Sequence, residues 1–423
     1  MSEKTQKLIL DSLLDKYERS SFFRDATQPT RRIMLNFYNG GRSDFAYYDI
    51  EQSERRIDVN GSVEDLAAAG LLSFEWMKGE HQHIIAKAWL NLDNLRSAYL
   101  AAGREPKADA TEKILSEIEA AQSNATAPWA KRFLQDAYGE TTRKRSISSA
   151  IPADSEDRRL LFKAIASIDE PGGTEYTERV FSLRTFGDTK LFERTVRSKL
   201  LSILRKYLES DDDAADSDLL KQVGIVKFPE QFEFCGNISL AFDQGTVNFG
   251  FLPGGASIRS FDLSAGLLSV GGSVETITTI ENYTNYLEYI RKSKAENELV
   301  IYHGGQISPR KLLFLRAVAN AMPANCMWRH WSDIDYGGFL MLSRLRREVV
   351  EAAAPYRMDA GELIRYGSLA APIKPRYAEK LRGLKARPEL ADCCDCIDYM
   401  LKNMVRLEQE AMLADNIALD TQR

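Results

Sequence analysis

The sequence has no long apolar run and no signal-peptide pattern. Its 423 residues contain no uninterrupted hydrophobic stretch near the roughly 20 residues that a membrane-spanning helix needs. The first ten residues, MSEKTQKLIL, do not combine a basic start, an apolar core and a cleavage site. These absences argue against a membrane-spanning or secreted protein, and they predict a cytoplasmic one.

Cysteine is scarce, with five residues in the whole chain. An odd number of cysteines argues against a disulfide framework. Three of them lie together at Cys393, Cys394 and Cys396, but zinc sites usually use two spaced pairs, and only Cys235 and Cys326 remain. We therefore expect reduced, buried thiols on a helix rather than a metal site.

An excess of positive charge is absent as well, since 56 Lys and Arg against 61 Asp and Glu give a net charge of −5. This balance excludes a wholly basic coat for nucleic acid. It does not exclude a local basic groove, because DNA responds to where charge lies. Residues 178–206 carry eight Lys or Arg and three acids, whereas residues 209–218 are strongly acidic. We interpret this change of sign as a linker or loop between two ordered parts.

The composition, 44% hydrophobic and 28% charged, is that of a globular protein long enough for two or three domains. The first hundred residues predict helices followed by a β-hairpin. Residues 5–19 place apolar side chains on one helical face, a short helix is expected from Ser62, and extended segments flank the polar turn at residues 78–80. This order is typical of a winged helix, which often binds DNA. An α+β protein-interaction module is the alternative.

Four regions are predicted along the chain. Residues 1–104 form the winged-helix-like region, residues 105–157 a helical connector or arm, and residues 158–273 a middle α/β region with the basic segment. Residues 274–423 form an α/β domain with C-terminal helices. In the first region, the basic side chains that could contact DNA are Lys16, Arg19, Arg31 and Arg32.

Polar clusters follow three β-like runs in the last third of the chain. The three clusters are Glu281-Asn282 after TITTI, His303-Gly304-Gly305 after ELVIY, and Asp333-Ile334-Asp335 after MWRHWS. Strands that alternate with helices predict a parallel sheet with crossover helices. In such sheets the reactive groups lie at the carboxyl ends of the strands. The three clusters are therefore expected at one edge of the sheet.

The carboxylates of these clusters favour a divalent metal site. Asp333 and Asp335 lie two residues apart, so both side chains are expected on the same side of the chain, and Glu281 would add a third carboxylate. Three close carboxylates repel one another unless they take up protons or bind a cation. Mg²⁺ or Mn²⁺ would suit oxygen ligands and could activate water against a phosphodiester. Isolated surface carboxylates at strand ends are the alternative.

Glycine pairs beside these clusters suggest contact with phosphate. Gly304-Gly305 and Gly337-Gly338 each precede a predicted helix, where backbone N–H groups can face an anion. His303, His330 and Arg310 could also contact phosphate. For each histidine a hydrogen bond to a local carbonyl is equally compatible with the sequence, and for Arg310 a solvated face is.

Together, TITTIENYTNYLEYI, VIYHGGQISP and WRHWSDIDYGGFLMLSRLR resemble the Toprim fold. With LLDKYERS, VFSLRTFGDTKLFE and MVRLEQEAM, the chain resembles the JetD family, the nuclease subunits of Wadjet anti-plasmid defence systems. These segments span nearly the whole chain in the expected order.

The resemblance implies a winged-helix DNA-binding region joined to a Toprim domain, in a layout similar to the topoisomerase VI A subunit. It implies a homodimer in which each protomer cuts one strand of closed circular plasmid DNA. The implied partners are an SMC-like ATPase motor, a kleisin and a kleisin-associated winged-helix subunit. By motif, Glu281, Asp333 and Asp335 would be the catalytic metal ligands, while the His303-Gly304-Gly305 motif has no assigned role.

Three alternatives stay open at this point. Topoisomerase relatives attack DNA with a tyrosine, and Tyr17 could be suspected of that role, although its place in an apolar stripe favours packing or a phosphate contact. Glu408 and Glu410, in a run of alternating charge, are left outside the core site. A scaffold that clamps DNA around a structural ion is the non-enzymatic alternative.

Overall fold

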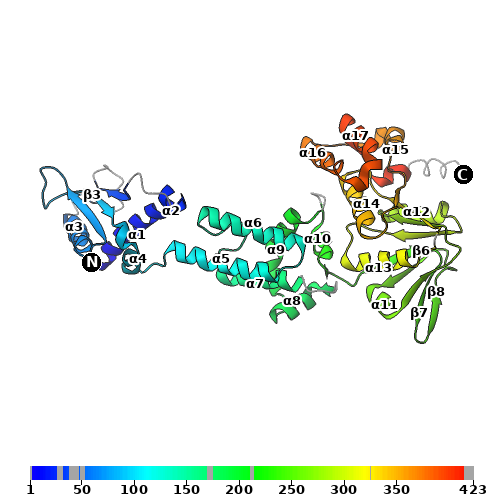
Figure 1. Ribbon diagram of the computed structural model, residues 1–423, viewed down its shortest axis with the longest axis horizontal. Helices are drawn as coiled ribbons and strands as arrows, with labels where there is room; N and C mark the ends of the chain where they lie inside the picture. The colour runs from blue at the N-terminus through cyan, green and yellow to red at the C-terminus, as the bar shows by residue number, and fades with distance from the viewer. Residues whose placement is uncertain are drawn as a thin grey trace. The chain divides into compact units, whose positions relative to one another are not determined.

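The structure is a computed structural model that describes residues 2–25, 32–37, 47, 53–168, 175–209, 214–323 and 325–413. Two compact units divide the chain, Met1–Ser155 and Glu156–Arg423 (Figure 1). Arg31 lies outside the described residues. No helix among the described residues is long and apolar enough to cross a bilayer.

The first unit is built from helices and a small antiparallel sheet. Its helices are α1 (Ser2–Arg19), α2 (Ser21–Asp25), α3 (Ser53–Ala68), η2 (Leu92–Asn94) and α4 (Leu95–Ala102). Its strands, β1 (Met34–Asn36), β2 (Leu72–Trp76) and β3 (Ile85–Leu90), pair in the order β1-β3-β2. The predicted hairpin is confirmed by the antiparallel pairing of β2 with β3.

The apolar stripe of α1 is confirmed, because Leu10, Leu13 and Leu14 are fully buried. Ser62 does not begin a helix. It is buried within α3, which starts nine residues earlier at Ser53. The early start was not apparent from the sequence because SERRID, the beginning of α3, is strongly polar.

The predicted connector contains two long helices, α5 (Lys107–Asn124) and α6 (Pro128–Lys144). Proline opens α6, where its fixed φ suits a first turn and its missing N–H costs nothing. The phenol of Tyr138 donates a hydrogen bond to Glu119 across the pair, at 2.9 Å. The two helices therefore pack on each other.

The second unit begins with a helical region that carries the basic segment. Its elements are α7 (Ser155–Ile168), β4 (Tyr176–Thr177), α8 (Glu178–Phe186), the π-helical turn η3 (Phe192–Val196), α9 (Arg197–Tyr207), α10 (Asp216–Gln222) and β5 (Ile225–Val226). The predicted acidic linker is in part ordered structure, because α10 starts at Asp216 and its carboxylate pairs with Arg197 and Arg205. Residues 210–213 of that run lie outside the described residues.

A six-stranded sheet forms the centre of the second unit. Its order is β14 (Ala354–Pro355), β13 (Met327–Trp331), β11 (Thr276–Ile280), β12 (Glu298–Tyr302), β6 (Gln231–Cys235) and β9 (Ala256–Arg259). The first four strands run parallel, which confirms the predicted parallel sheet. Strands β6 and β9 add antiparallel pairs, so the sheet continues past the predicted boundary at residue 274.

Buried apolar runs explain this central position. Strands β11 and β12 are buried along most of their length, as expected for parallel strands covered on both faces. The helices that connect the parallel strands are α12 (Tyr283–Lys292), α13 (Pro309–Asn320) and α14 (Tyr336–Glu348). One continuous apolar core, which includes the Trp328 and Trp331 rings, joins sheet and helices.

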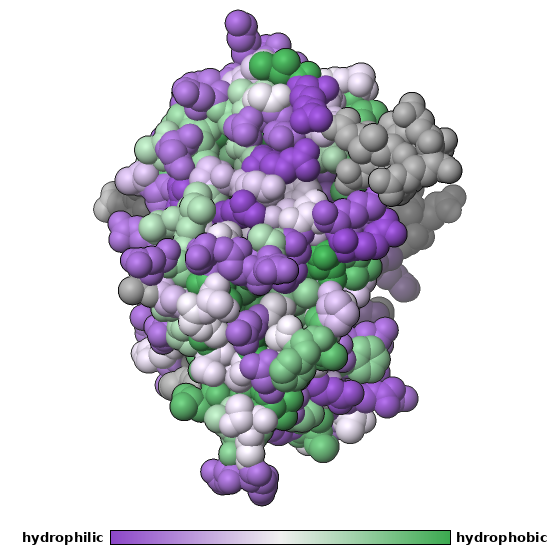
Figure 2. All heavy atoms as spheres, turned by 90° about the vertical axis from the view of Figure 1, so that its right-hand side faces the viewer, coloured by the Kyte–Doolittle hydropathy of each residue, from purple (hydrophilic) through white to green (hydrophobic). Residues whose placement is uncertain are grey.

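A smaller sheet and a set of short helices complete the second unit. The small sheet has the order β10 (Leu267–Val270), β7 (Ile238–Phe242) and β8 (Gly245–Asn248), and α11 (Ser260–Ala265) precedes β10. Figure 2 shows a mostly hydrophilic face with scattered hydrophobic patches. The C-terminal elements are α15 (Ala360–Arg365), η4 (Gly367–Leu369), β15 (Ala371–Pro372), α16 (Pro375–Leu384), η5 (Pro388–Cys393), α17 (Cys394–Asn403), β16 (Val405–Arg406) and η6 (Gln409–Leu413).

The cysteine cluster lies in these C-terminal helices. Cys393 and Cys396 are buried, Cys394 is partly buried, and all five cysteines are free thiols. Burial raises the pKa of Cys393 to about 12, so the thiol stays protonated at neutral pH. The expectation of reduced thiols on a helix is confirmed.

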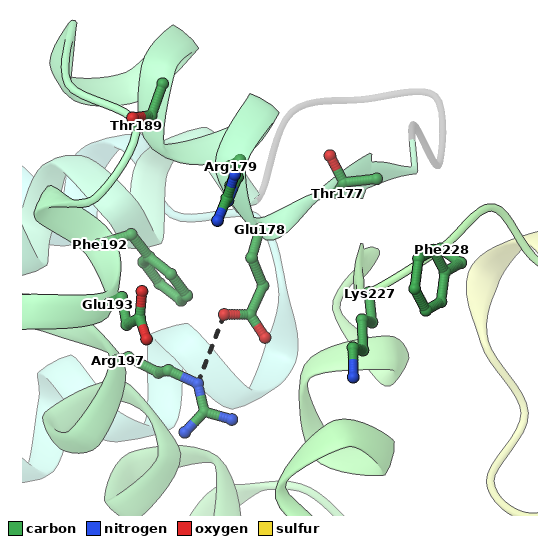
Figure 3. A pocket seen from close by; sticks show the side chains of 9 residues that line it. All are labelled: Thr177, Glu178, Arg179, Thr189, Phe192, Glu193, Arg197, Lys227 and Phe228. Atoms are coloured by element: carbon green, nitrogen blue, oxygen red, sulfur yellow. Dashed lines mark ion pairs between the residues drawn. The ribbon is translucent and has the colours of Figure 1, made fainter.

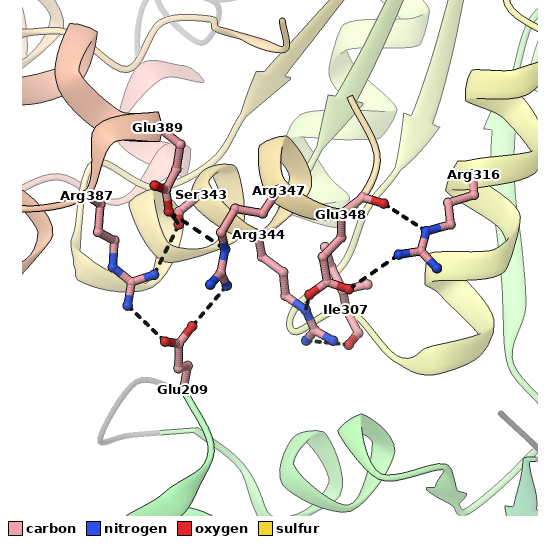
Figure 4. Close-up of polar contacts among 9 residues, drawn as sticks. All are labelled: Glu209, Ile307, Arg316, Ser343, Arg344, Arg347, Glu348, Arg387 and Glu389. Atoms are coloured by element: carbon pink, nitrogen blue, oxygen red, sulfur yellow. Dashed lines mark hydrogen bonds and ion pairs between the residues drawn. The ribbon is translucent and has the colours of Figure 1, made fainter. Parts of the chain in front are cut away.

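An ion-pair group ties the helical region of this unit to the sheet region. Glu209, just after α9, contacts Arg347 of α14 at 3.2 Å and Arg387 at 3.1 Å (Figure 4). Beside it, Arg344 donates to the carbonyl of Ile307 at 2.8 Å. These contacts fasten the far end of α14, the helix that begins directly after Asp335.

Candidate metal centre

Glu281 and Asp333 are neighbours because their strands are neighbours. Glu281 follows β11 and Asp333 follows β13, and the two strands pair in parallel. The N–H of Glu281 donates to the carbonyl of Trp331 at 3.0 Å, which extends the pairing beyond the strand end. The N–H of Asp333 lies 3.4 Å from Oε2 of Glu281. The sequence-predicted pair therefore meets at the carboxyl edge of the sheet.

Asp335 is held in a different way, at the start of α14. Its Oδ1 accepts a hydrogen bond from the N–H of Gly338 at 2.8 Å, which caps the helix. Its Oδ2 accepts from the hydroxyl of Tyr377 at 3.3 Å and lies 3.6 Å from the Arg406 guanidinium. Asp335 is thus buried and committed to protein partners on both oxygens.

The C-terminal segment adds two carboxylates that the sequence analysis left outside the site. Ile334 and Leu407 exchange main-chain hydrogen bonds of 2.9 and 3.1 Å. The N–H of Gln409 then donates to Oδ1 of Asp333 at 2.6 Å. As a result, one oxygen each of Asp333, Glu408 and Glu410 lie within 4.8 Å of one another.

A signal for this approach was present in the sequence. Glu408 and Glu410 lie two residues apart, so in extended chain both side chains point to one side. In the structure this holds only in part, because β16 and the bridge at Leu407 are extended but Glu410 already lies in the 3-10 helix η6. What local pattern does not contain is the bridge between Ile334 and Leu407, which joins segments far apart in the sequence.

The carboxylates raise one another's proton affinity. The pKa of Asp333 is raised to about 8, first by burial and then by the charges of Asp335, Glu408 and Glu410. The hydrogen bond from the N–H of Gln409 acts in the opposite direction and lowers this pKa. Burial and then Asp333, Asp335 and Glu408 raise the pKa of Glu281 well above its usual range. A bound cation would offset the repulsion between these carboxylates, so that they could stay ionised at neutral pH.

The donor set fits a hard divalent cation. All of the converging donors are carboxylate oxygens, which Mg²⁺ and Mn²⁺ prefer over softer ligands. Opposite ligands in an octahedral Mg²⁺ site lie about 4 Å apart, comparable with the 4.8 Å limit on the spacing of Asp333, Glu408 and Glu410. These three residues would hold the ion, with Glu281 beside them.

The two histidines lie in the interior. His303 and His330 are fully buried, with ring centroids 5.0 Å apart. Nδ1 of His303 bonds to the carbonyl of Gly304 at 2.7 Å, and Nδ1 of His330 pairs with the hydroxyl of Thr279 at 2.8 Å. Burial lowers the pKa of His330 to about 3 and that of His303 well below its usual value. Both rings are therefore neutral at physiological pH.

The glycine pairs differ from each other. Gly304 is buried and adopts φ +65°, a left-handed turn that favours glycine, while Gly305 is exposed. Gly338 is buried against the Asp-x-Asp turn, where an added Cβ would lie 2.1 Å from the carbonyl oxygen of Asp333. Its small size therefore serves the packing of α14 on the site.

The predicted DNA-contacting cations occupy separate places. Arg310 is partly buried and its Nη1 lies 3.2 Å from the hydroxyl of Ser264. In the first unit, Lys16 donates to the carbonyl of Met34 at 2.9 Å, and the Arg32 guanidinium lies 5.8 Å from the centre of the Trp89 ring. Arg19, at the end of α1, is exposed. A role for these cations in DNA binding stays a prediction.

A separate cleft of about 740 Å³ lies in the basic segment (Figure 3). Its lining residues are Thr177, Glu178, Arg179, Thr189, Phe192, Glu193, Arg197, Lys227 and Phe228. Inside it, Glu178 and Arg197 form an ion pair of 3.5 Å. Phe228 is exposed at its rim. The cleft gives the basic segment a concave face with charges of both signs.

Two comparisons with known proteins agree with this architecture. Residues 263–419, which hold every carboxylate of the centre, match the family model "Wadjet protein JetD, C-terminal". A relative from Bacillus cereus (strain Q1), named Wadjet protein JetD, is 28% identical over 419 residues, which cover 97% of this chain and 98% of the relative. The chain therefore resembles JetD along nearly its whole length.

These matches confirm the resemblance seen in the sequence segments. The match to the relative runs through both units of the chain, so it covers the N-terminal module as well as the carboxylate centre. The chemistry of the centre is a separate question, which rests on the geometry of its carboxylates.

Proposed function

We propose that this chain, which resembles JetD, is a metal-dependent endonuclease that hydrolyses closed circular plasmid DNA. The observation that carries the proposal is the convergence of Asp333, Glu408 and Glu410 beside Glu281 at the carboxyl ends of parallel strands. A cluster of this kind, with raised proton affinity and oxygen donors alone, suits a divalent ion and a phosphodiester.

The fold supports the finer parts of this proposal. The strand order β13-β11-β12, with Glu281 after one strand and Asp-x-Asp after its neighbour, is the arrangement expected of a Toprim domain. Helices followed by the β2–β3 hairpin in the first unit suit a winged-helix module. We infer that the first unit contacts the DNA backbone. We infer the same, separately, for the cleft of the basic segment in the second unit.

When bound, Mg²⁺ or Mn²⁺ would polarise the scissile phosphate and lower the pKa of a water molecule. The residues of the chain orient the carboxylates. Gln409 holds Asp333 through its N–H, and its side-chain oxygen accepts from the N–H of Asn282 at 2.9 Å. Asn282 in turn donates from its side chain to Glu410 at 2.5 Å. Asp333 and Glu410 are thus held before substrate arrives.

The partners in this proposal are those of a Wadjet complex. An SMC-like ATPase, a kleisin and a kleisin-associated winged-helix subunit would deliver DNA to the chain. A homodimer would place one carboxylate centre at each strand of the duplex. Cutting is expected to depend on these partners, because a freely active nuclease would damage the host chromosome.

Cleavage of supercoiled plasmid by the reconstituted complex, with Mg²⁺ or Mn²⁺, tests the function. Glu281→Ala and Glu408→Gln should each abolish cutting, whereas Asp398→Asn should not. Asp398 is the matched control, because its carboxylate is exposed and paired with Lys385 at 2.6 Å on α17, outside the centre. Cutting by Glu281→Ala at the wild-type rate would refute the proposal.

The tyrosine alternative predicts a different product. Tyr17 packs its ring against Phe22 and Phe23, with centroids 5.9 and 5.5 Å away. Burial raises the pKa of its phenol, which disfavours the phenolate needed for attack. Denaturing gels should therefore show free DNA ends; protein attached to the ends would support transesterification instead. A DNA clamp with a structural ion would leave the plasmid intact.

A further inference from the structure

Lys311, in the first turns of α13, is a lysine buried in the interior of the second unit. Its ammonium donates to the main-chain carbonyl of His303. It lies 3.9 Å from Oε1 of Glu230, which is also buried, and 5.5 Å from the centre of the Tyr302 ring. The carboxylate of Glu230 accepts further from the hydroxyl of Ser308. A buried ion pair thus stands directly behind the end of β12.

Burying these charges is costly. Desolvation lowers the pKa of Lys311 to about 8, a sign that the interior disfavours its charged form. Replacing a buried ion pair by apolar or neutral groups of similar volume is often neutral or stabilising. The stability of the fold therefore does not by itself explain a lysine at this position.

The location of the ammonium supplies another reason. The carbonyl of His303 lies just past the end of β12, beside the ends of β11 and β13. The N–H of His303 donates to the carbonyl of Ile280 at 2.7 Å, and the next residue is Glu281. Glu281 is bonded in turn to the carbonyl of Trp331. The hydrogen bond from Lys311 to His303 is therefore the first in a series of main-chain contacts that continues through Ile280 and reaches Glu281 in the carboxylate centre.

The turn after His303 makes this tie necessary. Gly304 turns the chain with φ +65°, so the strand pairing stops there. The carbonyl of His303 has no place in the regular ladder beyond this turn, and a buried carbonyl needs a donor. A lysine reaches it from the next helix. Glu230, which also pairs with Lys221 at 2.7 Å, lies 3.9 Å from the ammonium and offsets part of its charge.

We propose that Lys311 and Glu230 are a positioning pair for the metal centre, holding the end of β12 so that the Glu281 carboxylate stays beside Asp333. This inference rests on the metal centre of the proposed function. It also assigns a role to the His303-Gly304-Gly305 motif. The motif supplies the carbonyl and the tight turn through which the pair acts.

Binding of Mn²⁺ to the full-length chain tests the pair without requiring cleavage. It is measured by the decrease of the electron paramagnetic resonance signal of free Mn²⁺. Lys311→Met keeps the side-chain volume and removes the amine. We expect Mn²⁺ to bind about tenfold or more weakly, the range typical when residues behind metal ligands are changed. Glu230 keeps its ion pair with Lys221 at 2.7 Å in this variant, so the chain should still fold. The amide of His303 should exchange faster with solvent.

Arg316→Met is the matched control on the same helix. Arg316 also donates from a cation to a main-chain carbonyl, that of Glu348 at 2.8 Å, but this carbonyl lies at the C-terminal end of α14 (Figure 4). This variant should bind Mn²⁺ like the wild type. If Lys311→Met does not fold, Lys311→Met/Glu230→Gln removes both buried charges; only Lys221, which is partly exposed and pairs with Glu230 at 2.7 Å, loses its carboxylate. This variant should show the same weakened binding.

The outcomes separate this inference from the proposed function. Wild-type Mn²⁺ affinity in a folded Lys311→Met or double variant would overturn the positioning pair and leave the metal centre standing. Failure of the wild type itself to bind Mn²⁺ would overturn both. Weakened binding in the Lys311 variants, with the Arg316 variant unchanged, supports the pair even where no DNA is cut.

Discussion

Without a divalent cation, the carboxylate centre should make the protein less stable as the pH rises from 6 to 8. The cause is Asp333, whose pKa is raised from its ordinary value of 3.8 to about 8, mainly by burial and by Asp335. At pH values between these two, the folded chain keeps a proton that the unfolded chain has lost. Stability therefore falls as pH rises through this window.

The magnitude follows from the same two values. From pH 6 to 8 the unfolded carboxyl is fully ionised, while the folded one begins to ionise only near pH 8. At about 1.4 kcal/mol per pH unit, the contribution of Asp333 falls by about 2 kcal/mol. Asp333→Asn cannot ionise and lacks this loss. The variant should gain about 2 kcal/mol on the wild type over the window.

Comparing the variant with the wild type removes the titrations that Asp333 does not influence. Glu281, whose pKa is raised mainly by burial and then by Asp333, shares the fall in stability with rising pH and adds to the difference. His303 and His330 have lowered pKa values, so their unfolded forms bind more protons near pH 6 and their contribution to stability rises with pH. The pKa of Lys311 is lowered to about 8, so its contribution to stability rises with pH only above that value, where the folded chain has lost a proton that the unfolded chain keeps. The contributions of the two histidines and Lys311 are common to both proteins and cancel in the difference.

Native-state amide exchange of β11 and β13 in EDTA measures this stability for the second unit alone. Repeating the series with Mg²⁺ should reverse the ranking, because the ion keeps Asp333 ionised and stabilises the wild type. Parallel pH profiles for wild type and Asp333→Asn in EDTA would refute the electrostatic reasoning.

Three further predictions concern other parts of the chain. Gly338→Ala should lower the free energy of unfolding of the second unit by about 1–3 kcal/mol, because its Cβ would lie 2.1 Å from the carbonyl oxygen of Asp333. Chemical denaturation measures this loss, and an unchanged midpoint would contradict it. Tyr17→Phe should cut plasmid at the wild-type rate with free ends, and loss of cutting on gels would argue for the hydroxyl. Arg104→Met should destabilise the first unit by about 1–2 kcal/mol in low salt and by less in high salt, because Arg104 pairs with three carboxylates of α1. A difference in melting temperature between variant and wild type that does not change with salt would contradict this prediction.

Local pattern was sufficient wherever one element buries a regular face. The apolar stripe of α1, the β2–β3 hairpin and the parallel order of the strands beside Glu281 and Asp333 were all predicted correctly. Ser62 shows the limit of this reasoning. A polar residue suggested a helix start, but tertiary packing buries it within α3.

The carboxylate centre could therefore be predicted only in part from the sequence. The residues Glu281, Asp333 and Asp335 follow strands, so the alternation and order of those strands predicted their common edge. The bridge between Ile334 and Leu407, which brings Glu408 and Glu410 to Asp333, depends on long-range packing of the C-terminal segment. Periodicity reports which way a side chain points within its own element. Only the tertiary structure decides which distant element it meets, because that choice depends on how the whole core packs.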